Sequence, residues 1–386
     1  MTDKIKAAVL TSGRQDYGIL RSTLKLLNDD PEFDLLLLVG GMHLSQKYGK
    51  TVNLIIEDDL PITKCIDWLK DDQDELTIHA QTGIVIQKVG QILDEIQPDF
   101  LMLVGDRYET IGAALAATYS GIPIVHLHGG EETLGAIDNQ LRHAITKLSH
   151  LHFVSHPNHA KRVIQMGERP ENVHVVGAPG LDNLFRDDLL GKPSLEKVFS
   201  IEMSPPVVIV TLHPVTAKPN ETTKVLSALI KAMGSIDGTY IITLPNADPG
   251  NQEIREEIRF WAHDKDRVIA VEAIGEKAYF SLMKIADAMI GNSSSGIIEA
   301  GVYQLPVVDI GSRQQGRAFG ENIIHTSASC NDVRRALERA ISEEFRSMLK
   351  GTTSLFGDGR SCFRIIRVLK HWAIPKTISK DFVQYE

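Results

Sequence analysis

Short apolar runs rich in β-branched residues alternate with helix-length amphipathic segments along the whole of the 386-residue chain. This alternation is typical of βαβ units, in which a helix connects neighbouring parallel strands. The first half is predicted to hold strands at residues 5–11, 35–39, 100–104, 123–127, 151–155 and 173–176, and the second at 207–212, 240–244, 268–271, 288–290 and 306–310. We therefore predict an α/β fold with two doubly wound parallel sheets.

The length of the chain indicates two Rossmann-like domains, because chains beyond roughly 250 to 300 residues usually divide. We expect the division at Gly177-Ala178-Pro179-Gly180 or in the proline-containing stretch 191–206. The first domain is predicted to span residues 1–178 and the second residues 179–361, with a closing helix in 362–386 that packs back on the first. Ligands of open α/β sheets bind beyond the carboxyl ends of the strands, so two facing sheets would hold a ligand in a cleft between them.

The composition argues against several classes of partner. The 41 basic and 50 acidic side chains give a formal net charge of −9, which does not favour nucleic acid. No apolar run approaches the roughly 20 residues needed to cross a bilayer, and no signal peptide is apparent, so we expect a cytoplasmic protein without membrane contact. The cysteines, Cys65, Cys330 and Cys362, are too far apart to suggest disulfides or a zinc site. Neither a dinucleotide fingerprint nor a P-loop is present, and no cofactor is expected.

Polar residues that follow predicted strands of the second half form a candidate diphosphate site. Ser293, Ser294 and Ser295 lie between a strand and a helix expected to start near Gly296, where amide groups and hydroxyls can bind an anion. A plain helix cap would give the same pattern. Glu299, expected in the first turn of that helix, could accept two ribose hydroxyls. Arginine forks and imidazoles suit phosphate oxygens, and the other strand-following candidates are Arg14, His213, Asn246 and Arg313.

The first half carries a denser set of acid and base residues around two strand ends: Asp106, His126, His128, Glu131, Asp138 and His143. Proton transfer at a sugar carbon needs such groups with separated pKa values. A metal site is disfavoured, because a His-x-His pair with scattered acids lacks the HExxH spacing of zinc helices. Some of these histidines are expected to have only packing or orienting roles.

Motifs in order along nearly the whole chain resemble those of the hydrolysing UDP-N-acetylglucosamine 2-epimerases. They are Ser12-Gly13-Arg14-Gln15-Asp16-Tyr17, Gly41-Met42-His43-Leu44, Gly105-Asp106-Arg107, His126-Leu127-His128-Gly129-Gly130-Glu131, Ile137-Asp138, Arg142-His143-Ala144-Ile145-Thr146-Lys147, His213-Pro214, Asn246-Ala247-Asp248, residues 291–296 and Gly311-Ser312-Arg313-Gln314-Gln315-Gly316-Arg317. The resemblance implies a GT-B-like architecture of two Rossmann-like domains facing across a cleft. It also implies an active site that converts UDP-GlcNAc and water into N-acetylmannosamine and UDP, as the first step of sialic-acid-type sugar synthesis.

In the reaction that the resemblance implies, UDP leaves with loss of the C2 proton to give 2-acetamidoglucal, and water then adds with inverted configuration at C2. Matching positions make Asp106, Glu131 and Asp138 candidates for proton transfer, and Arg107 and His143 orienting or sugar-contacting groups. His43 joins the substrate-binding set by the same comparison. Many members carry a glutamate where this chain has His128, so the base stays open among the carboxylates and His128.

Three alternatives remain at this stage. A close variant acts on UDP- or GDP-linked N,N'-diacetylbacillosamine, as in legionaminic acid synthesis, and differs only in groups at C4 and C6. A GT-B glycosyltransferase would share the phosphate and ribose set but would not need the residues between Asp106 and His143. A nucleotide-sugar sensor without turnover would have lost some of those residues. The family resemblance also implies a homo-oligomer, either a dimer or a tetramer.

Overall fold

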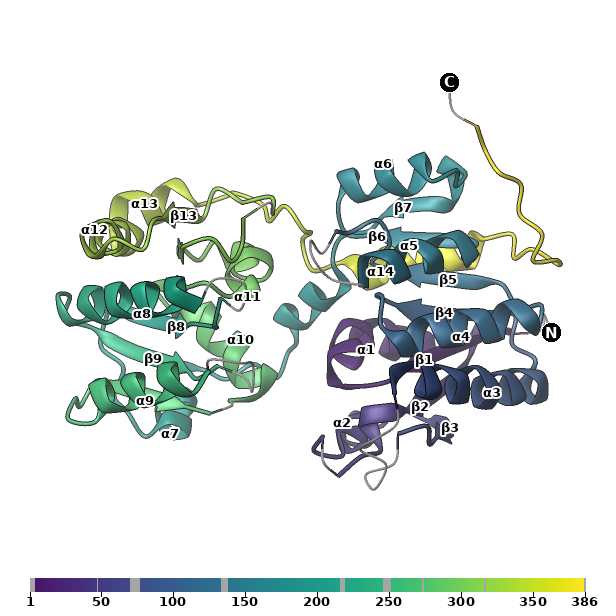
Figure 1. The fold of residues 1–386 in the computed structure, drawn as a ribbon, viewed down its shortest axis with the longest axis horizontal. Coiled ribbons are helices and arrows are strands. Elements are labelled where there is room, and N and C mark those ends of the chain that lie inside the picture. The colour runs from purple at the N-terminus through teal and green to yellow at the C-terminus, as the bar shows by residue number, and fades with distance from the viewer. Residues whose placement is uncertain are drawn as a thin grey trace. The chain divides into compact units, whose positions relative to one another are not determined.

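A computed structural model describes residues 4–46, 48–69, 77–132, 138–215, 219–245, 251–272, 274–315 and 317–384. The chain divides into two compact units (Figure 1). Unit 1 consists of Met1–Asn183 together with Gly359–Glu386, and unit 2 of Leu184–Asp358. The 3₁₀ segment η3 (Pro179–Phe185) carries the chain across the first division. Asn183 belongs with unit 1, because its side-chain amide donates to the carbonyl oxygen of Gly18 and its Oδ1 accepts from Ser22 at 3.1 Å.

Unit 1 is a seven-stranded parallel sheet in the order β3-β2-β1-β4-β5-β6-β7. The strands are β1 (Ile5–Thr11), β2 (Phe33–Gly40), β3 (Ile62–Ile66), β4 (Phe100–Val104), β5 (Ile124–Leu127), β6 (Leu151–Val154) and β7 (Val173–Val175). The helices are α1 (Arg14–Asp29), α2 (Val52–Glu57), α3 (Ile78–Ile96), α4 (Tyr108–Tyr119), α5 (Asp138–Leu148), α6 (Pro157–Gln165) and α14 (Ser361–His371), with 3₁₀ turns η1 (Gly41–His43) and η2 (Pro170–Asn172).

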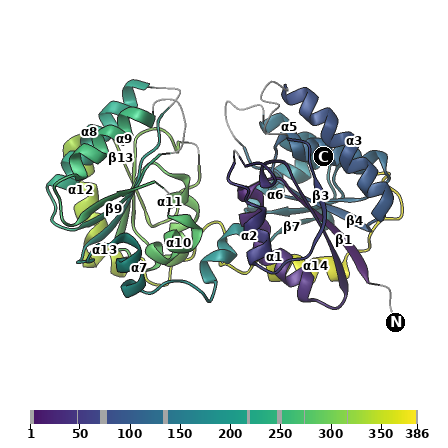
Figure 2. The ribbon, with the colours of Figure 1, turned by 90° about the horizontal axis from the view of Figure 1, so that it is seen from below.

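Helices cover both faces of this sheet. Because successive side chains of a strand point to opposite faces, both sets of side chains are buried. Ala7 and Val9 of β1 point into a core shared with α1 and α14, whereas Ala8 and Leu10 point into a second core with α3, α4 and α5. Figure 2 shows α1 and α14 together beneath the sheet and α3 and α5 above it. Strands that are buried on both faces have continuous apolar sequences, and for this reason they could be predicted from the sequence.

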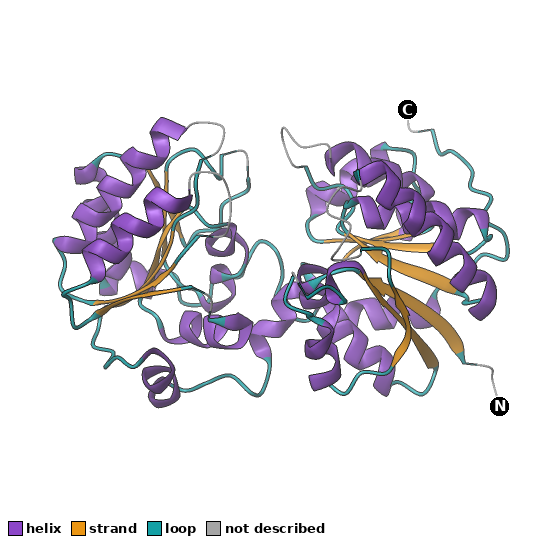
Figure 3. Cartoon of the chain, turned by 60° about the horizontal axis from the view of Figure 1, so that its bottom comes forward, coloured by secondary structure: helices purple, strands orange, loops and turns teal. Residues whose placement is uncertain are grey.

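Unit 2 repeats the arrangement with a six-stranded parallel sheet in the order β10-β9-β8-β11-β12-β13, again sandwiched by helices (Figure 3). The strands are β8 (Val207–Thr211), β9 (Thr239–Thr243), β10 (Val268–Val271), β11 (Ala288–Gly291), β12 (Val307–Ile310) and β13 (Ile323–Thr326). The helices are α7 (Lys192–Phe199), α8 (Pro219–Gly234), α9 (Asn251–Ala262), α10 (Gly275–Ile285), α11 (Ser294–Ile298), α12 (Cys330–Ile341) and α13 (Glu343–Met348). The 3₁₀ turn η4 (Ala300–Tyr303) directly follows α11 in the chain.

Both sheets have the Rossmann strand order, so each has a point where successive connections run in opposite directions. These topological switch points lie between β1 and β4 in unit 1 and between β8 and β11 in unit 2. Doubly wound sheets bind ligands beyond the carboxyl ends of the strands at such points. The fold therefore directs attention to the loops after β1, β4, β8 and β11.

The closing helix α14 returns the chain to unit 1, where it packs beside α1 and buries Ile365, Ile366 and Leu369. Asp182 fixes its start, because the carboxylate accepts hydrogen bonds from the amides of Ser361 at 3.0 Å and Cys362 at 2.6 Å. These amides belong to the first turn of the helix, which has no internal acceptors for them. The two predicted parallel α/β sheets are confirmed.

Two strands lay outside the prediction, β3 and β13, each at an edge of its sheet. Lys64 and Cys65 interrupt the apolar run of β3, and the side chain of His325 interrupts that of β13. An edge strand has one neighbour and one partly exposed face, so its sequence needs less continuous apolar character.

Candidate active site

Two carboxylates from the loops after β4 and β5 lie beside an arginine of α5 in unit 1. Arg142 of α5 lies with its side chain buried and makes an ion pair with Asp106, which follows β4. Its other terminal nitrogen lies 3.9 Å from Oε2 of Glu131, which follows β5. Arg142 therefore balances two negative charges at the carboxyl edge of the sheet.

His128 and Glu131 form a hydrogen-bonded pair in the loop after β5. The Nδ1 atom of His128 lies 2.7 Å from Oε1 of Glu131. Burial by itself would raise the pKa of Glu131, but the attraction and hydrogen bond of His128 and the hydroxyl of Ser155 outweigh it and hold the pKa well below its usual range. Because an ionised carboxylate only accepts, Nδ1 carries a proton, and in the neutral ring Nε2 is the nitrogen with a free lone pair. This Nε2 is buried and has no hydrogen-bond partner among the described residues.

The backbone of His128 adopts φ of +64°, a left-handed conformation that is uncommon for a residue other than glycine. Such strain is often found at functional positions, where the surroundings hold a side chain in a particular direction. Here the hydrogen bond to Glu131 and a backbone hydrogen bond from the amide of His128 to Phe153 of β6 at 3.0 Å hold it.

Ser155 and His159 extend this pair beyond the residues that the sequence pointed to. The Ser155 hydroxyl donates to Oε1 of Glu131 at 2.7 Å and accepts from Nδ1 of His159 at 3.0 Å. Ser155 directly follows β6, so the strand-end criterion that found the other loops could have found it. His159 lies one turn into α6, and its contribution depends on how α6 packs, which no local pattern reveals.

Two other candidate histidines of the first half, His126 and His43, are buried and neutral. His126 donates from Nε2 to the carbonyl oxygen of Gly105 at 2.8 Å, and burial lowers its pKa to about 3. His43 lies between the hydroxyls of Thr11 at 2.9 Å and Thr51 at 2.8 Å, and burial lowers its pKa to about 4. With both ring nitrogens bonded to threonines, His43 presents no free nitrogen to a ligand in this structure.

The remaining first-half candidates are more loosely arranged. Arg107 caps α4 and makes a two-point ion pair with Glu109, at 3.0 and 3.1 Å, while its side chain stays 39% exposed. Burial lowers the pKa of His143 on α5, and the neighbouring Arg162 and Arg142 lower it further. Arg14 starts α1 and is exposed. Asp138 is the first residue of α5, and its side chain lies outside the described part of the structure.

In unit 2, Asn292 organises the switch point between β8 and β11. Its amide group accepts from the backbone N–H of His213 at 2.8 Å and donates to the carbonyl oxygen of the same residue at 2.9 Å. Arg313 and Gln314, which follow β12, both donate to the backbone oxygen of Asn292, at 2.9 and 2.8 Å. The loops after three neighbouring strands are thus tied together, and His213 and Arg313 both contact Asn292 at this edge. Asn246 lies outside the described residues.

The serine loop differs in one detail from the prediction. Helix α11 begins at Ser294, because the Ser293 hydroxyl caps it by accepting from the amide of Ser295, and it ends at Ile298. Glu299 therefore closes this short helix and starts η4, and the expected place in the first turn is wrong. Burial raises the pKa of Glu299 to about 7, and its Oε2 has no hydrogen-bond partner within the described chain.

No group of three or more His, Cys, Asp or Glu side chains is placed to hold a metal ion in the described residues. Within the same residues, no helix is long and apolar enough to cross a membrane.

Both sheets have the Rossmann strand order. Acid and base residues lie at the carboxyl edge of the first sheet, and histidine, arginine and serine side chains lie at that of the second. These features define a two-domain α/β protein of GT-B-like architecture. A solved structure titled UDP-GlcNAc 2-epimerase from Neisseria meningitidis bound to UDP-GlcNAc superposes with a TM-score of 0.80, covering 95% of this chain and 100% of that one at 16% identity. At this identity the match shows the fold.

The sequence comparison is more specific. The UDP-N-acetylglucosamine 2-epimerase family matches residues 25–370. The GDP/UDP-N,N'-diacetylbacillosamine 2-epimerase (hydrolyzing) of Campylobacter jejuni is 33% identical over 98% of this chain and 99% of its own length. The UDP-N,N'-diacetylbacillosamine 2-epimerase (hydrolyzing) of Legionella pneumophila is 33% identical over 95% of each chain. The chain is thus an enzyme of the UDP-N-acetylglucosamine 2-epimerase family.

Proposed function

We propose that this enzyme is a hydrolysing 2-epimerase, which uses water to release the nucleoside diphosphate from a nucleotide-linked 2-acetamido sugar and inverts C2. The two hydrolysing relatives, similar over nearly the full length, support this reaction class. Their names make UDP- or GDP-N,N'-diacetylbacillosamine the first substrate to test. UDP-GlcNAc, with N-acetylmannosamine as product, is the second, because the family as a whole is named for it.

The observation that carries the mechanism is the free, buried Nε2 of His128. A C2 proton beside an acetal carbon is barely acidic, so the diphosphate must begin to leave first, and positive charge at C1 then acidifies C2–H. We assign removal of this proton to Nε2 of His128. Glu131 fixes the tautomer through Nδ1 and stabilises the imidazolium that forms. Asp106 and Asp138 are the candidates for the second proton transfer, when water adds to the glucal.

The leaving diphosphate needs positive charge and donors at its oxygens. We assign this role to Arg14, His213, Asn246, Arg313 and the serine loop, Ser293, Ser294 and Ser295. Each donor aimed at developing negative charge contributes about 3 kcal/mol in comparable sites. Glu299, with its unbonded Oε2, is assigned to the ribose hydroxyls, which would supply the donors that this buried oxygen lacks.

The decisive experiment incubates the protein in D₂O with each nucleotide sugar and follows the products by NMR. We expect free nucleoside diphosphate and a free sugar of inverted C2 configuration that carries deuterium at C2. Hydrogen retained at C2, a product still attached to the nucleotide, or turnover only with an added sugar acceptor would overturn the proposal.

A matched pair of variants tests the assignment of His128 and Glu131. Glu131→Gln should lower kcat by about 10² to 10⁴, the range for a lost general-base function, with nucleoside diphosphate affinity unchanged. The control is Glu132→Gln at the next residue, whose carboxylate is 47% exposed and pairs with Arg162. Equal rates for the two variants would contradict the assignment.

A further inference from the structure

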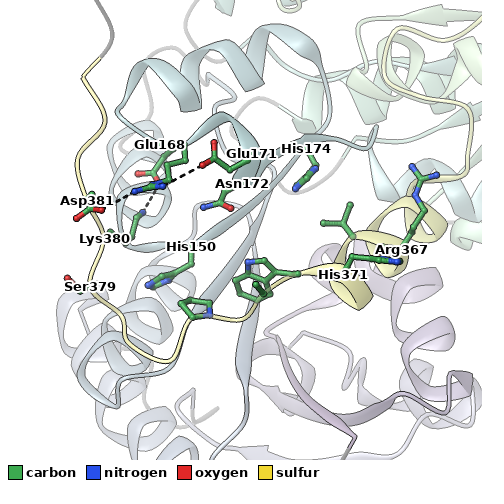
Figure 4. A pocket seen from close by; sticks show the side chains of 15 residues that line it. His150, Glu168, Glu171, Asn172, His174, Arg367, His371, Ser379, Lys380 and Asp381 are labelled. Atoms are coloured by element: carbon green, nitrogen blue, oxygen red, sulfur yellow. Dashed lines mark hydrogen bonds and ion pairs between the residues drawn. The ribbon is translucent and has the colours of Figure 1, made fainter. Parts of the chain in front are cut away.

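A cavity of about 780 Å³ lies in unit 1 away from the loops described above. Its lining includes His150, immediately before β6, and Asn172, immediately before β7, so it opens at the amino ends of the strands. Helix α14 and the chain that follows it, residues 373–381, form the other walls (Figure 4). Its volume is typical of pockets that bind small molecules. The candidate active site uses the opposite, carboxyl edge of the same sheet.

The wall nearest the C-terminal chain has its charges paired. Glu168 is buried and accepts from Lys147 at 2.6 Å and from His152 at 3.1 Å, and it forms an ion pair with Lys380 at 2.7 Å. Arg169 pairs with Asp381 at 3.0 Å and lies 3.6 Å from Glu171. This wall is therefore close to neutral and offers few groups for a charged ligand.

The wall formed by α14 differs. Arg367 and His371 lie one helical turn apart and both line the cavity, and His174 of β7 lines it from above this helix in Figure 4. No hydrogen bond or ion pair of the Arg367 guanidinium occurs among the described residues. His371 donates from Nδ1 to the carbonyl oxygen of Arg367 at 2.8 Å, which leaves its Nε2 for the cavity. The cavity lining thus includes one unbalanced cation, Arg367, and two imidazoles, those of His371 and His174.

We propose that this cavity binds a small organic oxyanion, with its phosphate or carboxylate group on Arg367 between His371 and His174. A guanidinium presents two parallel N–H donors that match either group. The neutral wall, with Asn172 and Ser379, suits a polar, uncharged body such as a hydroxylated chain or ring. A metal ion is a poor fit, because no metal-binding cluster occurs among the described side chains and the unpaired group is a cation.

Isothermal titration calorimetry with three matched probes tests the proposal: glucose 6-phosphate, gluconate and glucose. We expect the two oxyanions to bind and glucose not to bind, and the tighter of the two identifies the preferred group. UDP should not displace the ligand, because the nucleotide site lies elsewhere.

Arg367→Gln should weaken oxyanion binding at least about tenfold, the lower range for loss of a charge-assisted hydrogen bond. Arg334→Gln, which removes an exposed arginine of α12 and the same charge, should leave it unchanged. Arg367 is itself exposed, so its replacement should leave the fold intact. Failure of both oxyanions to bind, equal affinities in the two variants, or displacement by UDP would each overturn the proposal.

Discussion

Glu168 provides the sharpest test of how unit 1 is held together. Its carboxylate is 3% exposed and lies between two lysines, Lys147 of α5 and Lys380 of the C-terminal chain, with His152 of β6 as a third partner. Replacement by glutamine keeps the size of the side chain but leaves the two lysines without their counter-charge. We expect Glu168→Gln to destabilise unit 1 and to loosen the C-terminal chain from it.

The magnitude follows from the pKa of the carboxyl. Burial by itself would raise this pKa, but hydrogen bonds from His152, Lys147 and Lys380 outweigh it and lower the pKa from 4.5 to about 2. A depression of this size stabilises the folded state by about 3 kcal/mol at pH 7. Because the folded pKa is the lower one, the stabilisation is complete above about pH 4.5 and is lost as the pH falls through 2. At pH 3 less than half of it, about 1.4 kcal/mol, should remain.

Thermal unfolding followed by circular dichroism, from pH 7 down to pH 3, measures this effect. A loss of about 3 kcal/mol in a unit of this size corresponds to a fall in Tm of roughly 6–12 °C. Glu171→Gln is the control, because that carboxylate is 64% exposed and should change Tm little. The reasoning is refuted if both variants melt alike at pH 7, or if the deficit of Glu168→Gln does not shrink on acidification.

Three further predictions concern other parts of the chain. Ser155→Ala removes one hydrogen bond from the carboxylate of Glu131 and should lower kcat about 3- to 10-fold in steady-state assays, with KM little changed. Gly291→Ala should lose at least about 2 kcal/mol in denaturant unfolding, because φ there is +146° and a Cβ would lie 1.9 Å from the Thr211 oxygen. In thiol-reagent titrations, Cys65 is exposed and should react rapidly, whereas Cys362, whose pKa burial raises to about 12, should react only after unfolding.

Most of the fold could be predicted because the central strands are buried on both faces. Every residue of Val207–Thr211 and Phe100–Val104 is buried, and all but Thr211 are apolar, so their sequences leave little choice of structure. Two of the edge strands, β3 and β13, were missed because they have few buried positions and are interrupted by polar side chains, Lys64 and His325, that hide the apolar pattern.

The residues of the candidate site could be predicted where they directly follow a strand, because ligands of parallel sheets bind at the carboxyl ends of the strands. That rule located Asp106, His128 and Glu131 because their loops follow neighbouring strands, but partners from helices depend on packing between distant segments. Arg142 lies 36 residues from Asp106, and their ion pair forms only when α5 packs against the sheet. The local sequence also does not distinguish His128 from His126. Nε2 of His128 has no hydrogen-bond partner among the described residues, whereas His126 is buried and neutral.

The discontinuity of unit 1 affects the order in which the protein can fold during synthesis. Unit 2 is a continuous stretch and has all of its residues once position 358 has left the ribosome. Unit 1 begins first yet must wait longest, since Ile365, Ile366 and Leu369 fill its core and Lys380 neutralises Glu168. Until α14 has been made, the apolar face of α1 that it covers stays exposed, which makes this stage of synthesis prone to aggregation.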